Sequence, residues 1–223
     1  MTNKIIYTIL SIIVLTTIVV GVILNTKKDQ SLETIDTPNS TSQETTIDSQ
    51  PNSSTTPLTP ASTFNLPIAD FQNRITKKPF GIFITPKNSP VQPENFTGYH
   101  TGTDVEYQDI SIDVPVYAIA DGVIILSRTA SGYGGVEIVK IDINGTAHSI
   151  LYGHIRPSSL TPIGTQIKKG QQIGLLGTGY SAETDGERRH LHLAVLSDDR
   201  VDVKGYVNTK TELSKWMDPV SLY

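Results

Sequence analysis

The sequence predicts an all-β domain of antiparallel sheets, sandwich-like or barrel-like, that follows an N-terminal transmembrane helix and a disordered linker. The β class rests on short apolar runs of period two with turn dipeptides between them, because such runs are typical of strands in sandwiches and barrels. A sustained apolar period of 3.6 residues, which would predict long amphipathic helices, is missing from the C-terminal part. The predicted transmembrane helix rests on one long uncharged apolar run near the N-terminus.

The uncharged run is Ile5–Leu24, 20 residues dominated by Ile, Val, Leu and Thr. A helix needs about 20 apolar residues to cross the hydrocarbon core of a membrane. A cleaved signal peptide has a shorter apolar region, about 7–15 residues, followed by small residues at the cleavage site. Because no such site follows Leu24, we expect an uncleaved anchor. The lysines on its two sides nearly balance, so charge alone leaves the orientation open.

Residues 25–63 are predicted to form a disordered linker. Within them, Ser31–Thr63 holds 16 Ser or Thr and four Pro among 33 residues, and has no Gly, aromatic or basic residue. Such a segment cannot bury enough apolar area to offset the entropy of ordering it. It is equally compatible with a stalk of defined reach and with a spacer that has no length requirement.

Residues 64–223 form the predicted globular domain, and they contain 16 of the 17 glycines and all five histidines. Three hairpins are expected, each around a turn dipeptide: Asp121-Gly122, Asn144-Gly145 and Lys169-Gly170. One short helical turn is expected near Leu213–Met217. The predicted strands are 114–120 with 123–126, 136–141 with 146–154, and 166–168 with 171–176.

Composition limits the possible chemistry. The chain has no Cys, which excludes disulfides, thiolate nucleophiles and cysteine-bound metals. Its net charge of −4 gives no electrostatic indication of nucleic-acid binding. A bound metal would therefore need histidine and carboxylate ligands.

His190 and His192 lie two residues apart in the alternating run Arg189–Val195. In a strand they project from one face, about 6.5–7 Å apart along the chain, while the leucines between them enter the core. The pair is compatible with a metal ligand beside a second functional imidazole. It is equally compatible with two idle histidines on an edge strand.

His100 and Asp104 lie in the sequence H-x-G-x-D, which is weak by itself. Together with His192 they form a set of two nitrogens and one oxygen, and catalytic zinc sites keep three protein ligands and one open position. His154 ends a predicted strand and could reach the same pocket. His148 lies six residues before His154, about 20 Å away at the rise of a strand, and we assign no role to His148.

These motifs resemble the lysostaphin-type zinc metalloendopeptidases. The resemblance rests on H-x-G-x-D at His100–Asp104, Tyr152-Gly153-His154 and His190-Leu191-His192, in this order. The stretches between them fit as well: Val114–Val123, Gly132-Tyr133-Gly134 and Gly170–Gly174, followed by Asp218-Pro219 near the end. The similarity covers about Pro79 to Tyr223. A difference precedes His190, where the family commonly has a short lead-in of small residues and this chain has the charged segment Ala182–Arg189.

The resemblance implies an antiparallel β fold with a groove over zinc, and peptides of bacterial peptidoglycan as substrate. His100, Asp104 and His192 correspond to the zinc ligands, and His154 and His190 to two non-ligating catalytic histidines. We expect His190 to act as the base and His154 as the oxyanion or proton-transfer partner, although the two roles can be exchanged.

Because peptidoglycan lies outside the cytoplasmic membrane, the resemblance also predicts the orientation. Residues 1–4 would be cytoplasmic, the anchor would pass once through the cell membrane, and the catalytic domain would be extracytoplasmic. Two other interpretations remain: a catalytically silent peptidoglycan-binding or regulatory domain of the same fold, and a carrier hairpin with a modified lysine at Lys168 or Lys169.

Overall fold

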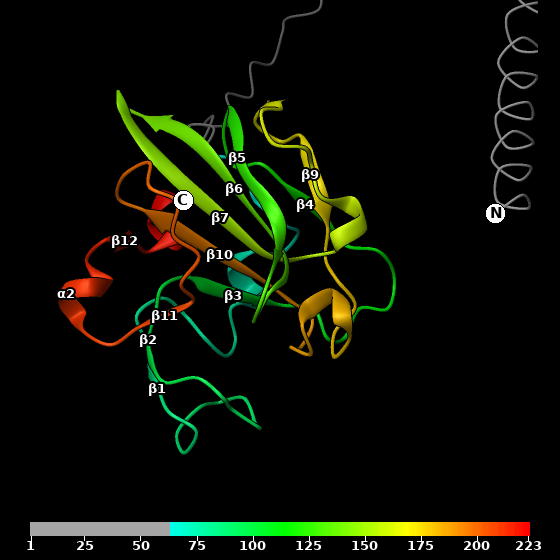
Figure 1. Ribbon diagram of the computed structural model, residues 1–223, viewed down its shortest axis with the longest axis vertical. Helices are drawn as coiled ribbons and strands as arrows, with labels where there is room; N and C mark the ends of the chain where they lie inside the picture. The colour runs from blue at the N-terminus through cyan, green and yellow to red at the C-terminus, as the bar shows by residue number, and fades with distance from the viewer. Residues whose placement is uncertain (1–62) are drawn as a thin grey trace, which may run out of the picture. The chain divides into compact units, whose positions relative to one another are not determined.

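The computed structural model describes residues 63–223, which form a mostly β domain of antiparallel strands (Figure 1). The predicted fold class of the domain is confirmed. The predicted cytoplasmic N-terminus, the anchor and all but the last residue of the predicted linker lie outside the described residues. Within 63–223, no helix has the length and apolar character to cross a membrane.

A seven-stranded sheet forms the centre of the domain. Its main path runs in the order β12-β10-β7-β6-β5-β8, and β3 pairs with β10 beside this path. The strands are β3 (Thr103–Glu106), β5 (Gly122–Ala130), β6 (Gly134–Ile143), β7 (Thr146–Ile155), β8 (Gln166–Ile167), β10 (His190–Leu196) and β12 (Trp216–Met217).

Two smaller sheets complete the β structure of the described residues. One has the order β1-β2-β11, with β1 (Phe83–Ile84), β2 (Gly98–His100) and β11 (Tyr206–Val207). The other pairs β4 (Pro115–Tyr117) with β9 (Gln172–Leu175). The helical segments are short: η1 (Gln72–Arg74), η2 (Pro157–Ser159), η3 (Ala182–Thr184), α2 (Lys210–Leu213) and η4 (Pro219–Leu222).

The expected hairpin around Asn144-Gly145 is confirmed as β6 and β7, which pair from Ile143–Thr146 back to Gly135–Ile155. Asn144 and Gly145 both have positive φ, as a type I′ turn needs. This hairpin supplies the longest strands of the sheet, which lie side by side in Figure 1.

The other two expected hairpins are wrong. β4 does not pair with β5, and β8 does not pair with β9; instead β4 pairs with β9 and β5 with β8. The two turn segments face each other, and the Asp121 carboxylate accepts hydrogen bonds from the Lys169 amide (2.7 Å) and the Lys168 ammonium group (3.1 Å). The helical turn expected near Leu213–Met217 lies earlier, at α2, and Trp216–Met217 is strand β12.

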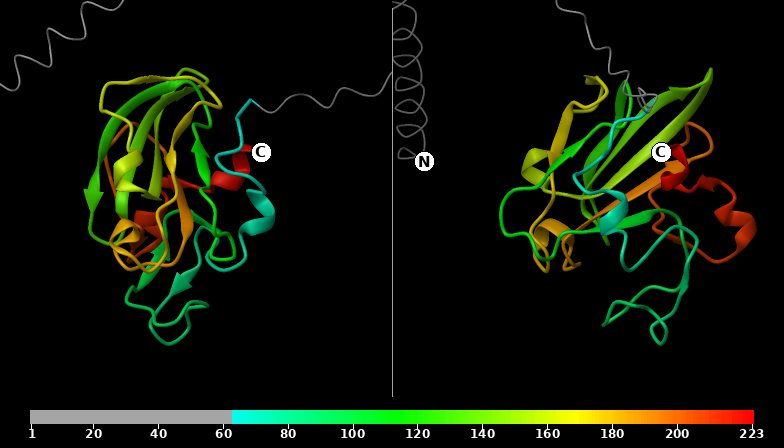
Figure 2. Two further views of the ribbon diagram at one scale, coloured as in Figure 1. Left: turned by 90° about the vertical axis from the view of Figure 1, so that its right-hand side faces the viewer. Right: turned by 180° about the vertical axis from the view of Figure 1, so that it is seen from behind.

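Two apolar clusters cover opposite faces of the large sheet. The larger contains Ile124, Tyr152 and Leu191, and the β4–β9 sheet contributes Val116 and Ile173 to it. Figure 2 shows the strands of the domain from two further sides. The smaller contains Ile138, Leu151, Ala194 and Trp216, among others. Burying one aliphatic side chain contributes about 1.5–3 kcal/mol. The alternation of apolar residues along β10 therefore determines which face of this strand packs against the larger cluster.

Candidate metal centre

Strand β10 presents His190 and His192 on the face of the smaller cluster. Leu191, Leu193 and Val195 belong to the larger cluster on the opposite face, as the alternation predicts. β10 is an interior strand, with β7 on one side and β3 and β12 on the other. His190 and His192 therefore do not lie on an edge strand, and both are buried.

The register between β3 and β10 places Asp104 beside the histidines. His192 lies opposite Asp104, and His190 lies opposite Glu106. Residues directly opposite each other in an antiparallel pair point to the same face. All four side chains therefore share one side of the sheet.

His100 comes from β2, and only Thr101 and Gly102 connect it to β3. A Cβ atom at Gly102 would lie 2.4 Å from the Leu193 carbonyl oxygen and 2.8 Å from Nε2 of His192. The link therefore passes directly over β10, which explains the glycine in H-x-G-x-D and brings His100 over the sheet face.

Three side-chain atoms converge at this point. His100 Nε2 lies 3.0 Å from His192 Nδ1 and 3.2 Å from Asp104 Oδ1, and His192 Nδ1 lies 3.1 Å from the same oxygen. Tetrahedral zinc with ligand distances of about 2.0–2.2 Å holds its donor atoms about 3.4 Å apart. The donor set and its spacing fit a zinc ion with three protein ligands.

A hydrogen bond sets the tautomer of His100 that this fit needs. The Nδ1 of His100 lies 3.2 Å from the Pro79 carbonyl oxygen, which can only accept, so Nδ1 carries the proton and Nε2 is free to bind a metal. His192 directs Nδ1 into the centre, and its buried Nε2 has no hydrogen-bond partner.

His154 reaches the centre through a β-bulge. Gly135 pairs with Ile155 and Val136 with Gly153, so His154 is the extra residue of β7, and its φ is 61°. Regular alternation would aim residue 154 into the larger cluster together with Tyr152. The bulge turns the side chain to the other face, where the rings of His154 and His190 lie 4.1 Å apart.

Burial lowers the pKa of both histidines outside the donor set, His154 and His190. Burial lowers the pKa of His154 to about 3, with Asp104 offsetting part of the effect. Burial likewise lowers the pKa of His190 well below its usual value. The Nδ1–H of His190 donates to the Arg188 carbonyl (2.8 Å), so its Nε2 carries the free electron pair.

A buried ion-pair network surrounds Asp104, and sequence reasoning did not identify it. Arg188 Nη2 lies 2.6 Å from Asp104 Oδ2, and the same guanidinium binds Glu106 through Nε at 3.0 Å. Burial alone would raise the pKa of Asp104, but His100, His190 and Arg188 together hold it well below its usual value. The only sequence signal for this network was the pair of arginines directly before a buried strand.

A cavity of about 320 Å³ opens over the centre. Asp104, His154, His190 and His192 line its floor. Its walls include Tyr133, Phe96 and Tyr206, together with Lys78, Glu187 and Lys204. Tyr133 packs against His154 and His192, with ring centroids 5.3 and 5.5 Å apart, and a Cβ atom at Gly153 would collide with its ring.

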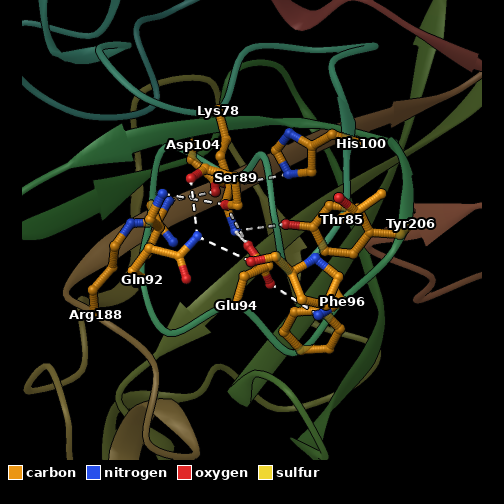
Figure 3. Close-up of polar contacts among 12 residues, drawn as sticks. Lys78, Thr85, Ser89, Gln92, Glu94, Phe96, His100, Asp104, Arg188 and Tyr206 are labelled. Carbon is orange, nitrogen blue, oxygen red and sulfur yellow. Dashed lines mark hydrogen bonds and ion pairs between the residues drawn. The ribbon is translucent and has the colours of Figure 1, made fainter.

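The wall that carries Phe96 is held by a buried ion pair (Figure 3). Lys78 Nζ lies 2.6 Å from Glu94 Oε2, and both side chains are 2% exposed. Glu94 also accepts hydrogen bonds from the Ser89 hydroxyl and the Phe96 amide. Phe96 stacks on Tyr206 at 5.2 Å, and the Tyr206 hydroxyl is bonded to Lys78.

The structure thus brings together all five predicted site residues: His100, Asp104, His154, His190 and His192. Their assignment as zinc ligands and catalytic groups remains a prediction. His148, to which we assigned no role, is bonded through Nδ1 to the Leu196 carbonyl (2.9 Å).

Comparison with known proteins agrees with this site. Residues 98–203 match the family model of "Peptidase family M23". Over 63 residues the chain is 41% identical to "Murein hydrolase activator EnvC" of Escherichia coli strain K12, a match that covers 28% of this chain and 14% of EnvC.

Two solved structures are similar at lower identity. A zinc-containing peptidase from Vibrio cholerae is 24% identical with a TM-score of 0.40, over 64% of this chain and 41% of that one. LytU is 19% identical with a TM-score of 0.41, over 73% of this chain and 84% of LytU. The chain thus matches only a small part of EnvC and less than half of the Vibrio peptidase.

The matched segment contains every residue of the candidate centre, from His100 to His192. The resemblance to the lysostaphin-type enzymes is confirmed by the match of residues 98–203 to the model of peptidase family M23.

Proposed function

We propose that this chain is a membrane-anchored, zinc-dependent metalloendopeptidase that hydrolyses peptide crosslinks or stem peptides of bacterial peptidoglycan. The proposal rests on one observation, which is that a set of metal donor atoms and two further imidazoles lie side by side. Three buried donor atoms lie 3.0–3.2 Å apart, and two neutral imidazoles that do not belong to that set lie beside them. A structural histidine cluster does not need the second pair.

In this proposal His100, Asp104 and His192 hold the ion through Nε2, Oδ1 and Nδ1. Bound zinc would polarise the scissile carbonyl and lower the pKa of water from 15.7 towards about 7. The chain contributes three ligands, of which His100 is oriented by the Pro79 carbonyl and Asp104 by Arg188.

His190 is the proposed general base. Its Nδ1–H is held by the Arg188 carbonyl, so the free pair on Nε2 can take a proton from the attacking water. The resulting imidazolium would lie 3.4 Å from Asp104 Oδ2, which stabilises its charge. The proton can then pass to the leaving amine.

His154 is the proposed partner of the oxyanion or of proton transfer. Its ring lies between His190 and Tyr133, and its buried Nδ1 has no hydrogen-bond partner in the structure. The buried hydroxyl of Tyr133, also without a partner, lies in the same cavity. Groups of this kind can donate hydrogen bonds to the negative charge that develops on a carbonyl oxygen.

A regulatory role is the second candidate, and the similarity to EnvC supports it. EnvC is named as an activator of murein hydrolases, so a domain of this family can be part of a protein that acts on another enzyme. The complete donor set and the two neutral histidines favour catalysis here. The two proposals differ in one observable property, which is whether the purified chain cleaves peptide bonds by itself.

The predicted anchor at Ile5–Leu24 would keep the domain at the outer side of the cell membrane, close to the wall. Protease treatment of intact cells tests this arrangement. Digestion of the C-terminal domain agrees with an extracytoplasmic location, and protection contradicts it.

The full chain in detergent, incubated with peptidoglycan and zinc, tests the function. We expect new amino termini in the released fragments by mass spectrometry, and none after treatment with a chelator. The variant His192→Ala should lose both zinc and cleavage. Retained zinc in this variant would refute the ligand assignment. If wild type alone cleaves nothing but raises the cleavage rate of an added hydrolase above that of the hydrolase alone, the regulatory role is favoured.

A further inference from the structure

The charged segment that precedes β10 ends in two arginines with different environments. The Arg188 side chain is 2% exposed and reaches the metal centre, whereas Arg189 is bonded to the carbonyls of Ile110 and Ile112. Only Arg188 touches a predicted zinc ligand. This difference between neighbours allows the role of Arg188 to be separated from that of a buried arginine in general.

Arg188 divides the two oxygens of Asp104 between two partners. Oδ1 faces the histidine donor atoms at 3.1 and 3.2 Å, and Oδ2 lies 2.6 Å from Arg188 Nη2. A charge-assisted hydrogen bond of this length is among the stronger ones in proteins. Asp104 is therefore held in the orientation in which a single oxygen points to the centre (Figure 3).

Glu106 in turn holds Arg188. Its carboxylate receives Nε at 3.0 Å and Nη2 at 2.8 Å, and strand alternation puts it on the same face as Asp104. Glu106 is further fixed by Lys77, at 3.8 Å from its Oε2. The planar guanidinium spans two carboxylates at fixed angles, which the single ammonium group of a lysine does not reproduce.

The main chain of the same residue positions the proposed base. The Arg188 carbonyl accepts the Nδ1–H of His190 at 2.8 Å. Fixing the side chain of Arg188 between two strand residues thus also restrains the carbonyl that sets the tautomer of His190. One buried residue connects the ligand set with the non-ligating histidine.

We infer that Arg188 is a positioning residue of the metal centre, which reserves Oδ2 of Asp104 and so presents Oδ1 alone to the ion. The inference rests on the proposed function, since it requires that the centre binds zinc. Without the guanidinium, Asp104 would lose the partner that sets its rotamer, and the Glu106 carboxylate would lose its buried hydrogen-bond donor. Partners of metal ligands typically change metal affinity or activity by about 10–100-fold when they are removed.

The test uses the full chain and compares Arg188→Met with the matched control Arg189→Met. Zinc affinity is measured by competition with a chromophoric chelator, and the ligand field by the visible bands of cobalt(II) bound in place of zinc. We expect Arg188→Met to bind zinc at least tenfold more weakly and to show altered cobalt bands. Arg189→Met should match wild type in both measurements, whatever its stability.

Two further variants guard against misfolding of Arg188→Met. Arg188→Lys keeps the charge and should recover the affinity only in part, and Glu106→Gln should give an intermediate loss. If Arg188 variants that fold bind zinc as tightly as wild type with unchanged cobalt bands, the inference is wrong although the proposed function stands. If wild type itself binds neither metal, the proposed function fails as well.

Discussion

Replacing Gly102 by alanine tests whether the short link between His100 and Asp104 sets the geometry of the centre. The new Cβ would lie 2.4 Å from the Leu193 carbonyl oxygen and 2.8 Å from Nε2 of His192, where ordinary contacts begin about 1 Å further out. The oxygen belongs to the backbone of β10, so either this strand or the link must move. Overpacking of this kind costs about 1–3 kcal/mol.

Movement of β10 or of the link would also separate the donor atoms, which now lie 3.0–3.2 Å apart. Because His192 and the flanks of the link carry all three ligands, we expect zinc affinity to fall by about 10–100-fold, the range found when ligand orientation is disturbed. Chelator competition measures the affinity, and urea unfolding measures the stability.

The control is Gly145→Ala in the β6–β7 turn. Gly145 has a φ of 83°, which disfavours alanine, but nothing lies within 4 Å of its Cβ position. It should lose about 1 kcal/mol of stability and keep its zinc affinity. A Gly102→Ala protein that binds zinc as tightly as this control would refute the account of the link.

Three further predictions concern groups around and away from the centre. His190→Ala and His154→Ala should each retain about one zinc by metal analysis and lose peptide cleavage by about 10²–10⁴-fold; a variant with near wild-type rates on muropeptides would exclude that histidine from catalysis. Burial raises the pKa of Glu137 from its usual 4.5 to about 7, so the folded chain keeps a proton that the unfolded chain releases, and stability is lost as the pH rises through this range. Glu137→Gln should therefore be more stable than wild type by about 3 kcal/mol at pH 8 and nearly equal at pH 4, in urea unfolding at both values; equal pH profiles would contradict the assignment. Lys78→Met leaves Glu94 buried without its cation and should cost about 3–5 kcal/mol in urea unfolding, whereas Lys78→Met combined with Glu94→Gln should recover part of the loss; no recovery would show that the pair does not act as a unit.

Local sequence patterns predicted the parts of this fold that depend on neighbouring residues. The Asn144-Gly145 turn specified a hairpin, and alternation in β10 placed His190 and His192 on one face, because both depend on backbone geometry within a few residues. The pairings of β4 with β9 and of β5 with β8 were missed. Turn dipeptides mark where a strand ends, but they do not say which distant strand pairs with it.

The candidate site shows the same division. The H-x-G-x-D and H-x-H motifs predicted which residues to examine, and the family resemblance grouped them. The bulge that turns His154 into the cavity could not be predicted, because it depends on the register of β7 against β6. Arg188 and the Lys78–Glu94 pair were missed because their partners lie 84 and 16 residues away in the chain.

We propose that the residues around this cavity hold zinc and cleave peptide bonds of the cell wall. Mass spectrometry of peptidoglycan incubated with the zinc-loaded full chain tests it most directly. We expect fragments with new amino termini that are absent with the chelated protein and with His190→Ala, while His190→Ala still carries zinc. Intact peptide chains after incubation with a zinc-loaded wild-type protein would contradict it.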